Sequence, residues 1–439
     1  MPSPRRHKAD ATMRLLWLNA GLLLPLDKGG KLRTWHLMRH LARRHEITYL
    51  SFIEPDTMPA LREGMREVCA HLQTVPRRDP GKGSAGFYAD AARRIFDPLP
   101  YAVGKYRSAE YRAKVDELLA RGFDLVVCDF LVPAVNMPAT LPCPSVLFTH
   151  NVEAEIWRRH AERQPDPVRR ALFRQQWRRM LRFEGATLQR FDRVLAVSDA
   201  DRETFHDLYP ASLRAPVYAV PTGVDTAFFT PRSGPVRPRH LVFTGSMDWI
   251  PNEDAMTYFC AEMLPRIRAA EPGVTLSIVG RAPTPAVQRL AAIHGVEVTG
   301  RVDDIRDSIA DAAVYVVPIR VGGGTRLKIF EAMAMGKAVV STTVGAEGLP
   351  VTHGRDVVIA DEPDAFATAV VTLLRDPGPR RQLETAARRL VVAHYDWTAV
   401  ADQFETALTT VQRREETAAE PGDAPSRGSL VPSPAPPRG

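Results

Sequence analysis

The chain has 439 residues, of which 45% are hydrophobic and 25% are charged, close to the average of globular proteins. This length predicts roughly two to four domains, and this composition excludes a wholly disordered chain, a collagen-like chain and a coiled coil. The formal net charge of +7 at pH 7 favours anionic partners such as nucleic acid, anionic lipid or phosphorylated ligands. The four cysteines, Cys69, Cys128, Cys143 and Cys260, lack the spacing of a zinc site or a disulfide framework, which indicates a reducing compartment.

The two ends of the chain are polar. Residues 1–12 are basic, and residues 413–439 are rich in proline, glycine and serine, so both segments are expected to be disordered. The apolar segment Leu15–Leu18 resembles the core of a signal peptide, but no small-residue cleavage site follows it. We therefore predict a buried strand over Met13–Asn19. No run reaches about 18 uninterrupted apolar residues, so no membrane-spanning helix is expected.

Between these ends, short apolar runs alternate with amphipathic stretches in two series. This alternation predicts βαβ units with buried parallel strands, and hence an α/β chain of two doubly wound domains. We place the first domain at 13–220, the second at 221–395 and a final helical stretch at 396–412. Ligands of such sheets bind at the carboxyl ends of the strands, so the cleft between the domains is the first candidate site. The expected strands are Ile47–Phe52, Leu125–Cys128, Ser145–Phe148 and Val194–Val197 in the first series, and Leu241–Thr244, Thr275–Val279, Val314–Val317, Ala338–Ser341 and Val357–Ile359 in the second.

Two candidates in the first series lie where strands end. Lys28-Gly29-Gly30-Lys31 follows the first strand and precedes a helical pattern, and His150 follows the run Val146–Phe148. The position of His150 at a strand's carboxyl end favours a functional role for it. An ordinary turn and a structural histidine are the alternatives.

The strongest local motif joins a buried strand to a helix through Gly322, Gly323 and Gly324. Glycines let a ligand approach the backbone, and a helix N-terminus offers free N–H groups and a positive dipole, so the turn predicts a phosphate or diphosphate site. Arg326 and Lys328 add positive charge in the first turn, where it is unfavourable for the helix itself. A bound anion would explain that placement. The alternative is a flexible loop followed by a solvated helix face, with no bound anion.

Segment 158–193 is the most basic part of the chain, with eleven arginines and four acidic residues. Phe173, Trp177 and Leu181 fall on one helical stripe. Three interpretations remain open: the stripe packs on the first domain, the segment lies on anionic lipid, or it binds nucleic acid. No recognised nucleic-acid-binding motif accompanies it.

Several of these segments together resemble glycosyltransferase family 4, whose members have the two-domain GT-B fold. The similarity extends over about 13–412 and is greatest to bacterial polysaccharide-type sugar transferases with a GGGTRLK motif. The segments that carry it are Gly322–Leu349, Val220–Asp225, Phe243–Trp249, Ile278–Arg281, His150–Glu153 and Val197–Ser198.

The resemblance implies a metal-independent hexosyltransferase that moves a sugar from a nucleotide-diphosphate sugar to an acceptor hydroxyl, with retention and without a cofactor. It further implies a role in the assembly of exopolysaccharide, lipopolysaccharide or another cell-surface glycan, with a glycan or lipid-linked acceptor. The resemblance places the protein in the cytoplasm, with an anionic membrane surface as an optional partner. The first domain would bind the acceptor and the second the donor, and the final helix would cross back to the first domain. A non-catalytic nucleotide-sugar-binding or scaffold protein and a nucleotide-sugar 2-epimerase are the alternatives.

The family motifs also imply site residues and show where this sequence departs from them. Gly323 stands where the family has the first Glu of its Glu-x7-Glu motif, and Glu331 matches the second, which contacts the nucleotide ribose. The family's Arg and Lys after Gly245 are absent, and we expect Arg326 and Lys328 to supply that charge to the leaving diphosphate. The expected residues are His150, Arg326 and Lys328 for catalysis; Gly245, Ser246, Arg281, Gly322, Gly323, Gly324, Thr325 and Glu331 for donor binding; and Gly29, Gly30 and Lys31 for a phosphate or acceptor loop.

One acidic motif has a plainer explanation. Asp199-Ala200-Asp201 matches the DxD pattern with which GT-A transferases hold a divalent ion, but three residues are weak support. Because Ser198 and Asp199 follow a predicted strand, we expect them to cap a helix.

Overall fold

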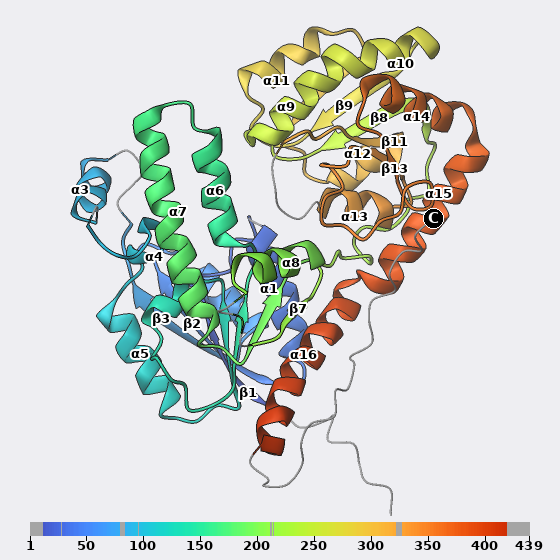
Figure 1. Cartoon of the computed structure of the whole chain (residues 1–439). Helices are drawn as coiled ribbons and strands as arrows, with labels where there is room; N and C mark the ends of the chain where they lie inside the picture. The colour runs from blue at the N-terminus through green and yellow to red at the C-terminus, as the bar shows by residue number, and fades with distance from the viewer. Residues whose placement is uncertain are drawn as a thin grey trace, which may run out of the picture. The chain divides into compact units, whose positions relative to one another are not determined.

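The computed structural model describes residues 12–27, 29–79, 84–94, 96–210, 213, 215–321 and 327–418 (Figure 1). The chain divides into two compact units. The first comprises the described residues up to Pro221 together with those from Val400 onward, and the second comprises Thr222–Ala399. Each unit is described by itself below.

The first unit contains a seven-stranded, wholly parallel sheet. Its strand order is β3-β2-β1-β4-β5-β6-β7, so the chain reverses direction across the sheet between β1 and β4. This is the doubly wound order with its switch point at β1 and β4, where ligands bind beyond the carboxyl ends of the strands. The strands are β1 Arg14–Leu18, β2 Glu46–Ile53, β3 His71–Pro76, β4 Leu125–Asp129, β5 Ser145–Phe148, β6 Arg193–Ala196 and β7 Val217–Ala219.

The second unit repeats the arrangement with six parallel strands in the order β10-β9-β8-β11-β12-β13. Its switch point lies between β8 and β11. The α/β fold with two parallel sheets is thus confirmed. The strands are β8 Arg237–Thr244, β9 Thr275–Val279, β10 Val296–Gly300, β11 Ala312–Val317, β12 Ala338–Ser341 and β13 Val358–Ile359.

Helices cover both sheets. The first unit has α1 Gly29–Leu41, α2 Pro59–Gly64, α3 Ala85–Arg93, α4 Tyr101–Gly104, α5 Ala109–Leu119, α6 Glu153–Arg163, α7 Pro167–Leu188 and α8 Asp199–Leu208. The second has α9 Ile250–Tyr258, α10 Leu264–Ala270, α11 Pro285–Arg289, α12 Ile305–Asp311, α13 Leu327–Ala334, α14 Pro363–Arg375 and α15 Pro377–His394. The last helix, α16 Trp397–Ala418, begins in the second unit and continues in the first.

The two points where the chain passes between the units are tied together inside the second unit. The backbone N–H of Val224 donates to the carbonyl of Tyr395 at 2.7 Å, and the Thr226 hydroxyl donates to Asp396 Oδ2 at 2.7 Å. A Cβ on Gly223 would lie 2.6 Å from the Trp397 ring, so this linker position requires glycine.

Helices α6 and α7 form an antiparallel pair in the first unit (Figure 1). Trp177 and Leu181 pack against the core of that unit, and Phe173 stacks on His160 of α6. The apolar stripe of segment 158–193 is therefore used in packing, as the first of the three interpretations expected. The arginines on the outer face of α7 remain exposed.

The start of α6 depends on a residue of α7. Helix α6 has no side-chain cap of its own, and the buried carboxylate of Glu184 accepts hydrogen bonds from the N–H groups of Glu153 at 2.9 Å and Ala154 at 3.1 Å. Burial raises the pKa of Glu184 to about 7. Free N–H groups at a helix start need such an acceptor, so Glu184 fixes the chain just after His150.

Two further expectations concern the whole chain. The four cysteines are free thiols, as their spacing indicated. Among the described residues, no helix combines the length and the apolar character needed to cross a bilayer.

Candidate functional site

The switch point of the first unit is built around Asp129, the last residue of β4. Its carboxylate is completely buried. Oδ2 accepts hydrogen bonds from Trp17 Nε1 at 3.1 Å, Asn19 Nδ2 at 2.7 Å and Thr34 Oγ1 at 2.8 Å. Trp17 belongs to β1, Asn19 follows the end of β1 and Thr34 belongs to α1. The carboxylate thus connects these elements at the carboxyl edge of the sheet.

His150 is the fourth partner of Asp129. Its Nε2 lies 2.7 Å from Asp129 Oδ1, and its Nδ1 lies 3.4 Å from an Arg33 guanidinium nitrogen. Burial lowers the pKa of His150; Asp129 opposes this shift and Arg33 adds to it. An ionised carboxylate only accepts and a guanidinium only donates, so the neutral ring carries its proton on Nε2 and its lone pair on Nδ1.

Phe130 and Gly30 enclose this histidine. The Phe130 ring stacks on the imidazole with centroids 3.8 Å apart, and its backbone has a φ of 67°, which is costly for an aromatic residue. A Cβ on Gly30 would lie 2.5 Å from the Phe130 ring and 3.5 Å from His150 Nδ1. Gly30 therefore permits the close packing of α1 on the histidine.

The predicted loop Gly29–Lys31 is instead the first turn of α1. Gly29 is exposed. Lys31 Nζ donates to the Pro25 carbonyl at 3.2 Å and pairs with Asp27 at 3.0 Å. Its ammonium is thus directed toward the preceding loop, whereas Gly30 contacts the histidine site.

The switch point of the second unit brings together three expected donor residues. Gly245 and Ser246 follow β8, and Arg281 follows β9. The Met247 N–H donates to the Arg281 carbonyl at 2.9 Å, so the two strand ends are joined. A Cβ on Gly280, whose φ is +155°, would lie 1.6 Å from the Gly245 carbonyl oxygen, so only glycine allows this close approach.

Lys328, the second residue of α13, reaches the same place. Its ammonium donates to Asn252 Oδ1 at 2.8 Å and lies 4.2 Å from the centre of the Phe243 ring. A Cβ on Gly245 would be 2.8 Å from Lys328 Nζ and 2.6 Å from Asn252 Nδ2. The Lys328 ammonium therefore lies beside Gly245, the position after which the family motif carries its cations.

Glu331 lies one turn further along α13. Burial raises its pKa to about 7, and Lys328 opposes that shift. Its charge also acts on the buried hydroxyl of Tyr315, which hydrogen-bonds to Thr244. A partly buried carboxyl with a pKa near neutrality, beside a cation at a strand end, is typical of a functional site.

The predicted glycine turn itself lies outside the described residues. This applies to Gly322, Gly323, Gly324, Thr325 and Arg326, whose assigned roles stay predictions. Of the expected site residues, the structure thus groups Gly30 with His150 in the first unit, and Gly245, Ser246, Arg281, Lys328 and Glu331 in the second.

Sequence reasoning missed Asp129, Arg33 and Asn252. Asp129 ends the apolar run Leu125–Cys128 as a single carboxylate at a strand's carboxyl end, which is a usable signal. Arg33 and Asn252 lie within helices, and the sequence around them carries no comparable signal of a functional role.

The DxD motif has the structural role that was expected. The Ser198 hydroxyl accepts the N–H of Asp201 at 3.1 Å and caps α8. Asp199 pairs with Arg202 at 2.7 Å, and the charge of Asp201 acts on buried Arg33.

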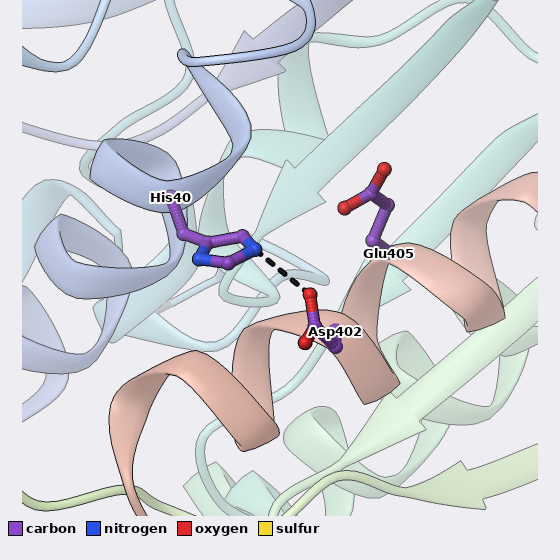
Figure 2. A group of neighbouring side chains, drawn as sticks. All are labelled: His40, Asp402 and Glu405. Carbon is purple, nitrogen blue, oxygen red and sulfur yellow. Dashed lines mark hydrogen bonds and ion pairs between the residues drawn. The ribbon is translucent and has the colours of Figure 1, made fainter. Parts of the chain in front are cut away.

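One group of potential metal ligands lies elsewhere in the first unit. His40 of α1 and Asp402 and Glu405 of α16 place donor atoms within 4.8 Å of one another (Figure 2). Arg44, however, donates to Asp402 at 2.9 Å and pairs with Glu405 at 2.6 Å. The two carboxylates already share this cation, and the group serves to hold α16 against α1.

Comparisons with known proteins cover both units. Residues 28–228 match the family model "Glycosyltransferase Family 4", and residues 238–376 match "Glycosyl transferases group 1". A phosphatidyl-myo-inositol mannosyltransferase of Mycolicibacterium smegmatis is 30% identical over 52% of this chain and 62% of its own length. A glycogen synthase of Mycobacterium tuberculosis is 25% identical over 65% of this chain and 68% of its own length. An uncharacterised 44.6 kDa protein from the cps region of Klebsiella pneumoniae is 23% identical and is matched over 42% of its length. The chain thus spans between two fifths and about two thirds of the length of these curated relatives.

Solved structures show the fold. Anabaena Alr3699/HepE in complex with UDP has a TM-score of 0.64 and 16% identity, covering 91% of this chain and 100% of that chain. A sucrose-phosphate synthase from Thermosynechococcus elongatus has a TM-score of 0.63 and 18% identity, covering 93% and 100%. Both sheets, the order of the two matched family segments and these similar structures agree. The chain therefore carries a glycosyltransferase family 4 domain followed by a glycosyl transferases group 1 domain, and it has the GT-B fold.

Proposed function

We propose that this protein is a retaining, metal-independent hexosyltransferase that moves a sugar from a nucleotide-diphosphate sugar to an acceptor hydroxyl during assembly of a cell-surface glycan. The observation that carries the proposal is the position of Lys328, 2.8 Å from Asn252 at the carboxyl end of β8. A fixed ammonium there can neutralise a diphosphate, which gains negative charge as its bond to the sugar breaks. The UDP held by the Anabaena structure and the mannosyltransferase and glycogen synthase relatives support the same donor class.

The residues divide the task as follows. Lys328, with Arg326, binds the diphosphate, and the Glu331 carboxylate accepts hydrogen bonds from the two ribose hydroxyls. The acceptor oxygen bonds to the anomeric carbon on the face that the diphosphate leaves. The bond from that carbon to the phosphate oxygen breaks, and the departing phosphate oxygen takes the acceptor's proton. Neutral His150 shares its Nδ1 lone pair, which Arg33 approaches only to 3.4 Å, with a substrate hydroxyl and is not needed as the base.

Nucleotide binding is the first consequence to test. We expect a UDP-sugar, a GDP-sugar or an ADP-sugar to raise the melting temperature of the wild-type protein by several degrees. A ligand at about 100 times its Kd adds roughly 2.7 kcal/mol to the free energy of unfolding. The pKa of about 7 for Glu331 predicts that affinity rises as the pH increases through 7, since only the carboxylate accepts both ribose bonds. A nucleotide sugar is the right probe because its diphosphate does not titrate in this range.

The variants Glu331→Gln and Glu331→Ala serve as controls for that measurement. Both should lose the thermal shift and its pH dependence, while melting without ligand at the wild-type temperature or higher, because a buried titrating carboxyl is removed. A wild-type protein that responds to no nucleotide would contradict the donor assignment. Tight binding of a nucleotide sugar with neither sugar transfer nor slow hydrolysis would favour the scaffold alternative. Loss of transfer in EDTA would contradict metal independence.

We also propose that the outer face of α7 contacts an anionic lipid surface. Arg174, Arg178 and Arg182 are exposed at four-residue spacing, and no carboxylate of the described residues pairs with them. Like charges at this spacing destabilise a helix, and an anionic surface would offset that repulsion. Val168 and Leu172, which are 77% and 47% exposed, lie on the same helix near its first turn.

Vesicle flotation checks this contact. At low salt we expect binding to phosphatidylglycerol vesicles and not to phosphatidylcholine vesicles, with release at high salt. Replacing Arg174, Arg178 and Arg182 together by glutamine should weaken binding on the order of 100-fold, at about 1 kcal/mol for each arginine. A triple glutamine variant of Arg266, Arg355 and Arg375 in the second unit removes the same charge and should bind as the wild type does. Equal binding to both vesicle types would rule out the proposed contact.

A further inference from the structure

Helix α9 touches the chain that leaves β11. Arg320 lies three residues after β11, and its guanidinium donates to both carboxylate oxygens of Asp254, at 2.6 and 3.2 Å. The same guanidinium lies 3.7 Å from the centre of the Tyr258 ring. Asp254 and Tyr258 are one turn apart on α9, so a forked ion pair and a cation–π contact hold Arg320 on one face of the helix.

The same helix also touches the chain that enters α13. Asn252, in the first turn of α9, accepts the hydrogen bond of Lys328 at 2.8 Å. Asn252 itself is held by its side-chain amide, which donates to the Ser246 carbonyl at 2.8 Å. Helix α9 is therefore connected to residues on both sides of segment 322–326, to Arg320 before it and to Lys328 after it.

We propose that Asp254 and Arg320 are a positioning pair through which α9 sets the affinity of the second unit for the nucleotide-diphosphate sugar. This inference rests on the proposed function. Arg320 acts through α9, whose Asn252 holds the Lys328 ammonium, and its guanidinium does not itself contact the diphosphate. Loss of the pair removes one of the contacts that hold the first turns of α9, and with them Asn252, at the carboxyl end of β8.

The surroundings of Arg320 support positioning over direct ligand binding. A cavity of about 450 Å³ lies against it, and its lining includes the carboxylates of Asp254 and Glu262. Two carboxylates make this cavity unfavourable for a phosphate. Asp254 also raises the pKa of Arg320, so the guanidinium remains charged and paired.

The expected effect is moderate because both side chains are partly exposed, 43% for Arg320 and 31% for Asp254. Exposed ion pairs contribute little unless their geometry is forked or networked, as it is here. We expect Asp254→Asn and Arg320→Gln each to raise the KM for the nucleotide sugar by about 5- to 10-fold. The value of kcat at saturating donor and the melting temperature should stay near those of the wild type, and Arg320→Lys should give an intermediate KM.

Donor affinity measured by calorimetry, beside initial rates, separates the outcomes. The control is Arg266→Gln, which breaks exposed pairs with Glu262 and Asp364 in the same unit and should leave KM unchanged. If the wild type binds no nucleotide sugar, the proposed function fails. If it binds and Asp254→Asn binds equally well, the positioning pair is wrong. If Arg320→Gln weakens binding and Asp254→Asn does not, Arg320 contacts the ligand directly, which also overturns the inference.

Discussion

Replacing Lys328 by methionine should weaken the affinity for the nucleotide-diphosphate sugar by about 10- to 100-fold and reduce transfer at least as much. A hydrogen bond from a charged donor contributes about 1.5–3 kcal/mol, and the charge matters more as the leaving group develops its own. Methionine has nearly the length of lysine but lacks the ammonium that lies over the Phe243 ring, so the fold should be retained while the charge is lost. Binding calorimetry and initial rates of released nucleoside diphosphate measure the two effects.

The geometry also allows a rescue experiment. Lys328 Nζ lies 2.8 Å from Asn252 Oδ1, so a lysine at position 252 can place its ammonium in nearly the same volume. Asn252→Lys in the Lys328→Met background should recover a measurable part of the affinity. As a matched control, Lys114→Met removes a lysine paired with Glu117 on α5 and should leave binding unchanged. Wild-type affinity in Lys328→Met would show that this cation does not hold the donor.

Asp129→Asn should lower kcat by about 100-fold while leaving nucleotide-sugar affinity unchanged. Three donors converge on Oδ2 of Asp129, so the new amide will direct its oxygen toward them and its NH2 toward His150. The Nε2 atom must then accept, and the proton moves to Nδ1, which faces Arg33 at 3.4 Å. A wrong tautomer at a substrate-orienting histidine removes its acceptor, and an equivalent change in serine proteases costs about 10⁴ in kcat.

Nitrogen chemical shifts of the His150 ring report the tautomer directly. They should show Nε2–H in the wild type and Nδ1–H in Asp129→Asn. Thr34→Val is the control, because it removes one donor to Oδ2 and leaves the bond between Oδ1 and His150 intact; its kcat should fall only slightly. If Asp129→Asn changes the tautomer and keeps wild-type kcat, His150 does not orient a substrate group.

Most of the fold was predictable because each interior strand is a short apolar run that can be recognised from the sequence alone. Ser145–Phe148, Thr275–Val279 and Ala338–Ser341 were predicted with the bounds that the structure shows. The strands not predicted are β3, β7 and β10, and each lies at the edge of its sheet. An edge strand has one neighbour and carries more polar side chains, so the apolar pattern that marks a buried strand is weaker there.

The site was predictable in part. Gly245, Ser246 and Arg281 follow predicted strands, and His150 does as well, so their place at the carboxyl edges follows from strand direction alone. The DxD motif and the packing of Trp177 and Leu181 also agree with local patterns. In contrast, Gly29–Lys31 turned out to be helical, because α1 begins before the apolar pattern that marks it in the sequence.

The local order of apolar and polar residues was enough to predict two parallel-sheet domains, and the sequence motifs were enough to indicate the family. The partners of the functional side chains depend on which strands become neighbours. Asp129 meets Trp17 across 112 positions of sequence, and Lys328 meets Asn252 across 76. Such contacts arise because doubly wound order brings the ends of β1 and β4, and of β8 and β11, to one edge. Strand neighbours are set by the packing of the whole sheet, so no local pattern encodes the acceptor that fixes the His150 tautomer or the helix that holds both Arg320 and Lys328.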